Sequence, residues 1–287
     1  ATGISLGADS SFENITFSSG TKVTTSSNIN VTGSWTNNGS FTANAGAVSF
    51  TSTSNPEPTV NFSGSGTNTF YDLVLQRNIY VQSSNTINHD LIAIKQRQGN
   101  FGNMSFYTGT TQTVAGQVNF KGIGSGSGQR QQAACETAGS TWNLECTGPN
   151  NHVFEFVNLS GCNNISGYPI VLKNSRDTGS NINFTFPGLN YKWTGNTSSN
   201  WNTASNWAAV DYTGNVSVPG QGAVITIPKD CSNYPVLPGN LDLTITVDAT
   251  SYGSITIEAA SADPSSSPGT LDLAGYTLKV LTLTNNG

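Results

Sequence analysis

Charged side chains are scarce in this chain of 287 residues. Asp, Glu, Lys and Arg make up 9% of the sequence, against about 25% in ordinary soluble domains. The formal net charge is −5 and the basic residues are scattered, so the chain lacks the clustered positive charge of nucleic-acid-binding proteins. No run of about 18 apolar residues occurs, as a membrane-spanning helix would require. The sequence therefore predicts neither nucleic-acid binding nor membrane insertion.

Helical periodicity and catalytic motifs are missing as well. Glycines and β-branched residues interrupt every stretch that could carry apolar residues at i, i+3, i+4 and i+7. The two histidines, His89 and His152, fit no Ser-His-Asp order, and the sequence contains no Gly-x-Ser-x-Gly turn, phosphate loop or calcium-binding aspartate repeat. We therefore expect a non-enzymatic, all-β protein without a metal or other cofactor.

Short apolar runs that end in Gly, Asn or Ser are abundant instead. In the stretch 33–50, GSWTNNGSFTANAGAVSF, the doublet Asn37-Asn38 before Gly39 predicts a turn between two short strands. Similar fragments with apolar residues at i and i+2 recur at 48–50, 60–62 and 118–120. This recurrence favours a β-solenoid, in which each coil buries its apolar residues by stacking on the next. A β-sandwich is the alternative, because it also uses short, closely spaced strands.

The sequence predicts two domains. Residues 1–190 form the solenoid-like part, interrupted at 122–151 by a polar, Gly-rich stretch that we interpret as a loop excursion from the stack. Residues 191–287 form a second β module that begins with a Trp-rich junction. Its clearest strand is 241–247, in which Leu241, Leu243, Ile245 and Val247 alternate with polar residues.

Four cysteines, Cys135, Cys146, Cys162 and Cys231, show no zinc-binding or redox spacing. The interpretation that we favour is disulfide bonding in an oxidising compartment, with Cys135 paired to Cys146 and Cys162 paired to Cys231. The alternative is that they are free, buried thiols.

Tryptophans are the candidate binding residues. Trp193, Trp201 and Trp207 lie close together in the sequence, and their ring faces could form a platform for sugar rings. The competing interpretation, which we favour, is that they fill the junction between two β modules. Trp142, within the predicted excursion, is a fourth candidate for ligand binding.

Enzymatic alternatives find little support. A polysaccharide lyase would need a basic residue beside acidic metal ligands, and Lys95 and Arg97 near His89 and Asp90 are the nearest match. The interpretation that we favour for these residues is a solvated strand and turn. Asp242 and Asp248 share one strand face but would be roughly 20 Å apart, which is too far for a pair of glycosidase carboxylates.

One segment resembles a known group of proteins. The spacing of Trp193, Gly195, Trp201, Asn206 and Trp207, followed by the strand 224–228, resembles a segment of large exported repeat proteins of Bacteroidetes and spirochaetes. The TNNG units at 36–39 and 284–287 and the stretch GTLDLAGYTLKV at 269–280 resemble the same proteins. Their repeats are similar to filamentous-haemagglutinin or autotransporter-passenger coils. The resemblance covers 28–75 and 191–287, and it implies a solenoid at the cell surface without indicating an activity.

The functional expectation is an exported, non-enzymatic structural or adhesive protein located outside the cell or on its surface. The low charge, the single methionine and the two histidines are typical of such proteins. The final TNNG unit carries no cap, so we expect either a fragment of a longer chain or end-to-end self-association into a filament. Alternatives are a carbohydrate-binding or polysaccharide-degrading β-helix module and a host-recognition fibre. The expected partners are further copies of the chain and a glycan or cell-surface ligand.

Overall fold

The computed structural model describes residues 3–54, 57–210, 218–247, 250–261 and 266–286. Short β-strands dominate these residues, and the helical element among them is a single 3-10 turn, η1 (Ala204–Asn206). None of the described segments forms a helix long and apolar enough to cross a membrane. The chain divides into two compact units, residues 1–170 with 180–184 and residues 171–179 with 185–287. The predicted all-β class is confirmed.

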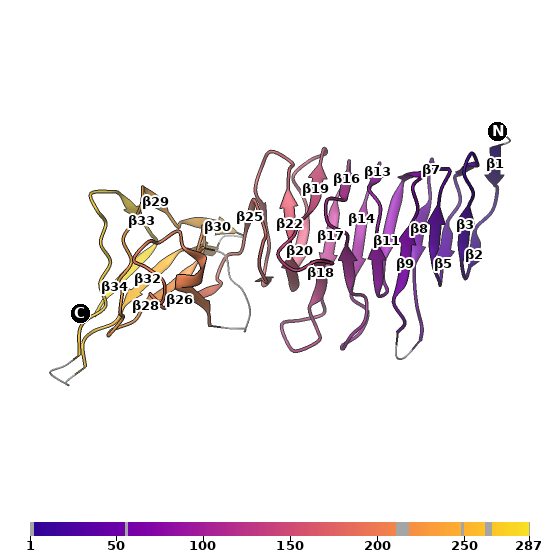
Figure 1. Ribbon diagram of the computed structural model, residues 1–287. Helices are drawn as coiled ribbons and strands as arrows, with labels where there is room; N and C mark the ends of the chain where they lie inside the picture. Colours follow the sequence, from indigo (N-terminus) through magenta and orange to yellow (C-terminus); the bar gives the residue numbers. More distant parts are fainter. Residues whose placement is uncertain (1–2, 55–56, 211–217, 248–249, 262–265, 287) are drawn as a thin grey trace. The chain divides into compact units, whose positions relative to one another are not determined.

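The first unit is a stack of coils, and each coil contributes one strand to each of three parallel sheets (Figure 1). We name these sheets A, B and C. Sheet A contains β1 (Gly3–Leu6), β4 (Lys22–Thr25), β7 (Ser40–Ala43), β10 (Thr67–Phe70), β13 (Asn85–Ile87), β16 (Thr111–Val114), β19 (Trp142–Cys146) and β22 (Cys162–Asn164). Sheet B contains β2 (Ser10–Phe12), β5 (Ile29–Val31), β8 (Ala47–Phe50), β11 (Asp72–Leu75), β14 (Leu91–Ile94), β17 (Val118–Lys121) and β20 (Val153–Glu155). Sheet C contains β3 (Ile15–Phe17), β6 (Trp35–Asn37), β9 (Val60–Ser63), β12 (Ile79–Val81), β15 (Met104–Phe106), β18 (Gln131–Cys135), β21 (Val157–Ser160) and β24 (Arg176–Asp177).

This parallel pairing confirms the β-solenoid and is unlike the antiparallel sheets of a β-sandwich. The predicted turn at Asn37–Gly39 joins β6 to β7, which lie in different sheets. The coils differ in length. Hydrogen bonds between neighbouring coils join residues that are 19 positions apart in the sequence at Asp9, 27 apart at Asn38 and 32 apart at Thr113. Length differences are absorbed in the loops between strands, while the sheets stay in register.

Aromatic side chains fill the interior of the early coils. Trp35 is fully buried, and its ring centroid lies 4.8 Å from Phe41, 6.0 Å from Phe62 and 5.9 Å from Phe70. These rings come from different coils, so their contacts join one coil to the next. Aromatic pairs in such edge-to-face arrangements add to the free energy gained by burial.

Polar side chains also lie inside the stack. Asn68 accepts hydrogen bonds at Oδ1 from Nε1 of Trp35 (3.2 Å) and from Nδ2 of Asn37 (2.9 Å). In the following coils, Nδ2 of Asn85 donates to Oε1 of Gln112 (2.8 Å). Buried amides must find such partners, since an unpaired buried polar group is costly. The inward positions of these coils are therefore joined by hydrogen bonds as well as by apolar contacts.

The predicted loop excursion at 122–151 was wrong. Within this range, β18 and β19 are full members of sheets C and A. Their inward side chains are buried, among them Ala133, Trp142 and Leu144. The polar residues at 122–130 were the reason for predicting a single long loop. In the structure, buried and half-buried positions alternate along both Gln131–Cys135 and Trp142–Cys146.

The second unit contains a mixed sheet in the order β27-β26-β28-β32-β34. Strands β26, β28, β32 and β34 pair in parallel, and β27 is antiparallel to β26. Two smaller sheets pair β29 with β33 in parallel and β30 with β31 antiparallel. The bounds of these strands are β26 (Asn190–Trp193), β27 (Trp207–Ala209), β28 (Val224–Ile227), β29 (Leu241–Asp242), β30 (Ile245–Val247), β31 (Thr250–Tyr252), β32 (Ser254–Ile257), β33 (Leu278–Lys279) and β34 (Thr282–Asn285). In chain order, β23 (Ile170–Val171), β24 (Arg176–Asp177) and β25 (Phe184–Thr185) precede them.

The strand predicted at 241–247 is divided in two. Oδ1 of Asp242 accepts hydrogen bonds from the backbone N–H of Thr244 (2.9 Å) and from its hydroxyl (2.6 Å). This local turn lies between β29 and β30, which belong to different sheets. The alternation of apolar residues continues across the turn, so the sequence pattern alone could not reveal the break.

Candidate functional site

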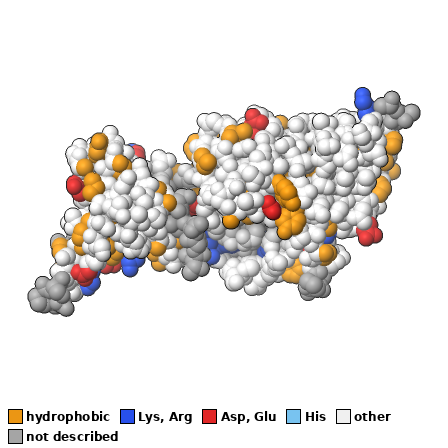
Figure 2. Space-filling view, viewed as in Figure 1, with side chains coloured by type: hydrophobic (Ala, Val, Ile, Leu, Met, Phe, Trp, Pro, Cys, Tyr) orange, Lys and Arg blue, Asp and Glu red, His pale blue; other side chains and the backbone are white. Residues whose placement is uncertain are grey.

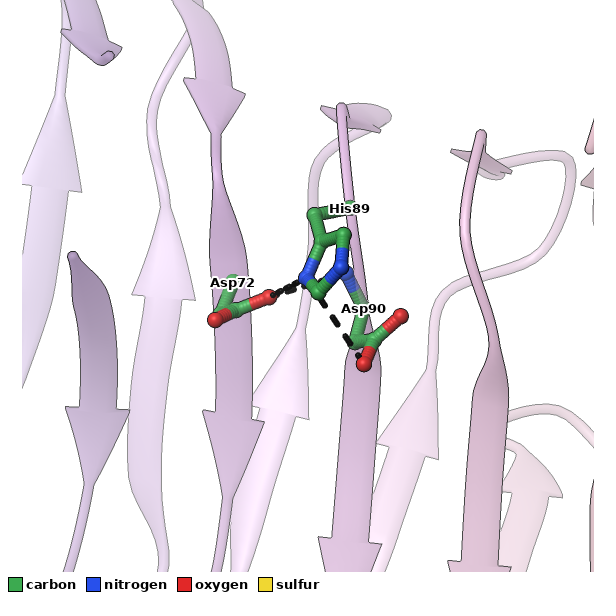
Figure 3. Close-up of side chains that lie close together, drawn as sticks. All are labelled: Asp72, His89 and Asp90. Atoms are coloured by element: carbon green, nitrogen blue, oxygen red, sulfur yellow. Dashed lines mark hydrogen bonds and ion pairs between the residues drawn. The ribbon is translucent and has the colours of Figure 1, made fainter. Parts of the chain in front are cut away.

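One cluster of metal-ligand side chains lies at a corner between sheets A and B. Asp72 begins β11, and His89 and Asp90 precede β14 in the next coil (Figure 3). Nδ1 of His89 lies 2.7 Å from Oδ1 of Asp72 and 3.7 Å from Oδ2 of Asp90. One potential ligand atom from each residue lies within 4.8 Å of the other two. Two carboxylates and an imidazole are a donor set that a divalent cation accepts.

The two carboxylates already have a structural role. Oδ1 of Asp72 accepts a hydrogen bond from the backbone N–H of Asp90 (3.0 Å), and Oδ1 of Asp90 accepts one from the N–H of Gln117 (2.7 Å). Asp9 makes the same contact to the N–H of Asn28 (2.8 Å) at the first such corner. The acidic residues thus belong to a repeated corner motif that bonds each coil to the next, and this role explains their positions without a metal ion.

His89 completes the cluster as an exposed imidazole. Its side chain is 48% exposed, and its ring stacks on Tyr71 with centroids 4.8 Å apart. The hydrogen bond to Asp72 raises the pKa of His89, and the charges of Asp90 and Asp72 act in the same direction. The arrangement is therefore a surface hydrogen bond that becomes an ion pair when the imidazole is protonated.

A second feature covers the outward side of sheet A. Side chains that carry a hydroxyl group occupy two positions on each of β7, β10 and β16, and one position on β13 with a second directly before it. All are exposed or half-exposed. We call this surface the hydroxyl face, and it consists of Ser40, Thr42, Thr67, Thr69, Ser84, Thr86, Thr111 and Thr113. A shallow trough of about 520 Å³ lies over the part of this face between Thr67 and Thr113, bordered by the loop Gly64–Gly66. Charged side chains lie at its two ends, with Lys22 in register beside Ser40 and Glu145 beside Thr113.

The predicted tryptophan platform is not present, because the rings are buried. Trp193, Trp201 and Trp207 have exposed fractions of 0%, 1% and 4%. They pack edge to face with centroids 4.8 Å and 4.7 Å apart, and Nε1 of Trp207 donates to the carbonyl of Trp201 (2.8 Å). Trp142 is also fully buried and stacks on Phe106 at 3.9 Å. These residues form packed cores, as in the competing interpretation of the Trp-rich segment.

The predicted disulfides are contradicted, since all four cysteines are free thiols. Cys135, Cys146 and Cys162 are inward-facing, buried residues of β18, β19 and β22, and Cys231 is half-buried. Burial raises the pKa of Cys146 to about 11 and that of Cys162 further above its usual range. Such thiols behave as small apolar core residues.

The lyase-like residues are not assembled either. Lys95 is 2% exposed and donates from Nζ to the carbonyl of Phe101, and burial lowers its pKa. Arg97 lies over the ring of Phe101 and donates to the carbonyl of Ser54. Both side chains hold the loops between sheets B and C. The expectation of a solvated strand and turn was wrong for Lys95, whose charge is buried near that of Glu57.

Comparisons with known proteins identify no relative. No family model, curated protein or solved structure matches the chain. The resemblance to exported repeat proteins therefore remains a prediction from the sequence, and the functional argument depends on the fold and surfaces described above.

Proposed function

We propose that this chain is an exported, non-enzymatic structural or adhesive protein that acts outside the cell or on its surface. The observation that carries this proposal is the continuous parallel stack of the first unit. Three ladders of backbone hydrogen bonds join each coil to its neighbours, and side chains at the corners add further bonds between coils. A stack joined in this way makes a stiff scaffold with long, regular faces.

The surface is consistent with this role. Charged and hydrophobic side chains are few and scattered on the visible face, and most of that face is neither (Figure 2). Such a surface relies little on charge for solubility. An adhesive protein needs a rigid frame that presents contact groups at fixed spacings, and the outward side chains of the sheets provide such groups.

End-to-end self-association is part of the proposal, and two edge strands support it. In β34, Leu283 is 53% exposed although it lies in register with buried Ile255. In β1, Ile4 is 51% exposed although it lies in register with buried Val23. Each of these two apolar residues is placed for coverage by one more strand, and in this proposal another copy of the chain supplies that strand. Joining two different edges would give an open, head-to-tail filament.

Two measurements on native material test the proposal. Protease treatment of intact cells, followed by immunoblotting, should remove the protein while a cytoplasmic marker survives. Protection until the cells are lysed would refute the extracellular location. Electron microscopy should show fibres built from repeating subunits, and substitution of Leu283→Lys in the purified chain should reduce fibre formation. Particles that stay monomeric at high concentration would refute the filament.

The carbohydrate-directed alternative loses the residues on which it was based. Its sugar platform required exposed faces on Trp193, Trp201 and Trp207, and these faces are covered by each other and by neighbouring residues. A titration with soluble glycans should accordingly leave tryptophan fluorescence unchanged.

A further inference from the structure

The hydroxyl face is a two-dimensional array. The register of sheet A aligns Thr24 with Thr42, Thr42 with Thr69, Thr69 with Thr86, and Thr86 with Thr113. We call this row the threonine rank. Two positions earlier on the strands, a second row begins with Ser40 beside Thr67 and continues through Ser84 and Thr111, whose backbone N–H donates to the Ser84 hydroxyl (3.0 Å).

The spacings of this array are set by the sheet. Neighbouring strands lie about 4.8 Å apart, and residues two apart on a strand are separated by roughly 6.6 Å. Threonine is also stiff about its first side-chain torsion, so the hydroxyl and methyl groups keep one orientation from coil to coil. The backbone of the face therefore repeats its hydroxyl-bearing positions at nearly constant distances in two directions, and the trough of about 520 Å³ follows those between Thr67 and Thr113.

The other two faces of the solenoid have the same backbone geometry but not this chemistry. On sheet B, the row that contains Ser49 continues with Val74 and Ile92. On sheet C, Asn61 is followed by Tyr80 and Ser105. Sheet C carries a shorter row of hydroxyls, with Thr16 beside Thr36 and Thr36 beside Ser63. The general preference of β-strands for threonine would act on all three faces alike, so it does not explain why a row of five threonines lies on sheet A.

The hydroxyls at the centre of the array are available to a ligand. Within the described part of the chain, Thr42, Thr69 and Thr86 make no side-chain hydrogen bond to the protein. Thr113, at the margin, donates to Glu145 (2.9 Å). Each free hydroxyl can donate one hydrogen bond and accept others.

We propose that the hydroxyl face binds ice. The prism face of ice repeats its oxygen atoms in two directions at distances comparable with those of the array, so several hydroxyls can meet lattice positions at once. A single hydrogen bond contributes only about 1 kcal/mol, so stable binding needs many such bonds at once. A rigid, periodic partner can form them simultaneously with a rigid, periodic face. A soluble glycan chain would lose conformational freedom on binding, and the face offers it neither aromatic rings nor charged bidentate groups.

The inference goes beyond the proposed structural role, and purified protein tests it independently of location. During slow growth of an ice front, the full chain should be enriched in the ice fraction, whereas an inert protein of similar size is excluded. Thr86→Tyr, which raises a bulky ring at the centre of the array, should lower this enrichment about tenfold or more. Thr86→Val, which keeps the shape but removes the hydroxyl, should lower it less.

A matched control uses the same new side chain on another face. Ser105→Tyr on sheet C should leave the enrichment unchanged, and β-sheet circular dichroism should show that both tyrosine variants are folded. Exclusion of the unmodified chain from ice would overturn the proposal. Equal losses in folded Thr86→Tyr and Ser105→Tyr would also overturn it. If the chain is not enriched in ice but is retained on crystalline cellulose or chitin in a way that depends on Thr86, the ligand is a crystalline polysaccharide and not ice.

Discussion

Individual polar side chains perform two tasks in this protein. Inside the stack, amides such as Asn68 and Gln112 bond to side chains of other coils. At the corners, carboxylates such as Asp72 accept backbone N–H groups of the next coil. Both tasks need a short side chain whose oxygen can reach a neighbouring coil, and Asn and Asp suit them. The abundance of Asn in the sequence therefore reflects coil stacking as well as solubility.

At this scale we predict a pH-dependent contribution from His89. Its pKa is raised in the folded state by the hydrogen bond to Asp72, so the ion pair contributes fully below the unfolded pKa of about 6.5. The contribution is lost as the pH rises through the folded pKa. Because the pair is exposed, we expect a loss of a few tenths of a kcal/mol in the free energy of unfolding.

Urea unfolding at pH about 5.5 and about 8.5 measures this contribution. The difference between the unmodified chain and His89→Gln should be larger at the lower pH. His152, whose pKa is lowered by burial, is present in both proteins and cancels in the comparison. Equal differences at the two pH values would show that the ion pair does not stabilise the fold.

The strands themselves are short, so the connections between them decide whether coils of unequal length can stack. Gly64, which follows β9, adopts φ +116°, and a Cβ at this position would lie 2.0 Å from the carbonyl oxygen of Asn37. The loop crosses the preceding coil at a distance that only glycine permits. Gly109 also has a positive φ, +75°, but a Cβ there would meet no atom within 4 Å.

These two glycines allow a matched prediction. Gly109→Ala should lower the free energy of unfolding by about 1 kcal/mol, the cost of a left-handed backbone for alanine. Gly64→Ala adds a clash with backbone atoms and should lower it by about 3 kcal/mol or more. Thermal and urea unfolding measure both values. Equal destabilisation by the two substitutions would show that the loop at Gly64 can move away.

The molecule as a whole depends little on charge. Its described surface ion pairs include Lys121 with Glu155 (2.8 Å) and Lys279 with Asp242 (3.0 Å), and both lysines are about half exposed or more. Pairs of this kind contribute about 0–1 kcal/mol and are screened by salt. The fold is stabilised mainly by the parallel ladders and by the buried aromatic and apolar side chains.

We therefore predict a weak salt dependence of stability. Between about 0.05 M and about 0.5 M sodium chloride, the free energy of unfolding should change by less than about 1 kcal/mol. Urea titrations followed by circular dichroism measure this change, and urea is suitable because it adds no ions. A larger decrease with salt would mean that charge pairs contribute more than their exposure suggests.

The sequence by itself determined the all-β class and the repeated coils. Short runs such as Val48 to Phe50, with apolar residues at i and i+2 before a polar turn, can bury those residues only on one side of a strand. Their recurrence along the chain indicates stacking. Composition likewise predicted that the surface would be neutral, because few charged residues are available to place on it.

The tertiary structure alone decided which residues meet. The two strands at 131–146 and the burial of Cys135 and Cys146 on them depend on coil lengths, which vary and leave no fixed period in the sequence. The threonine rank shows this best. Thr42, Thr69, Thr86 and Thr113 are spread unevenly along the chain, and the register of sheet A brings them into one row, because parallel strands align residues by hydrogen bonding and not by sequence distance.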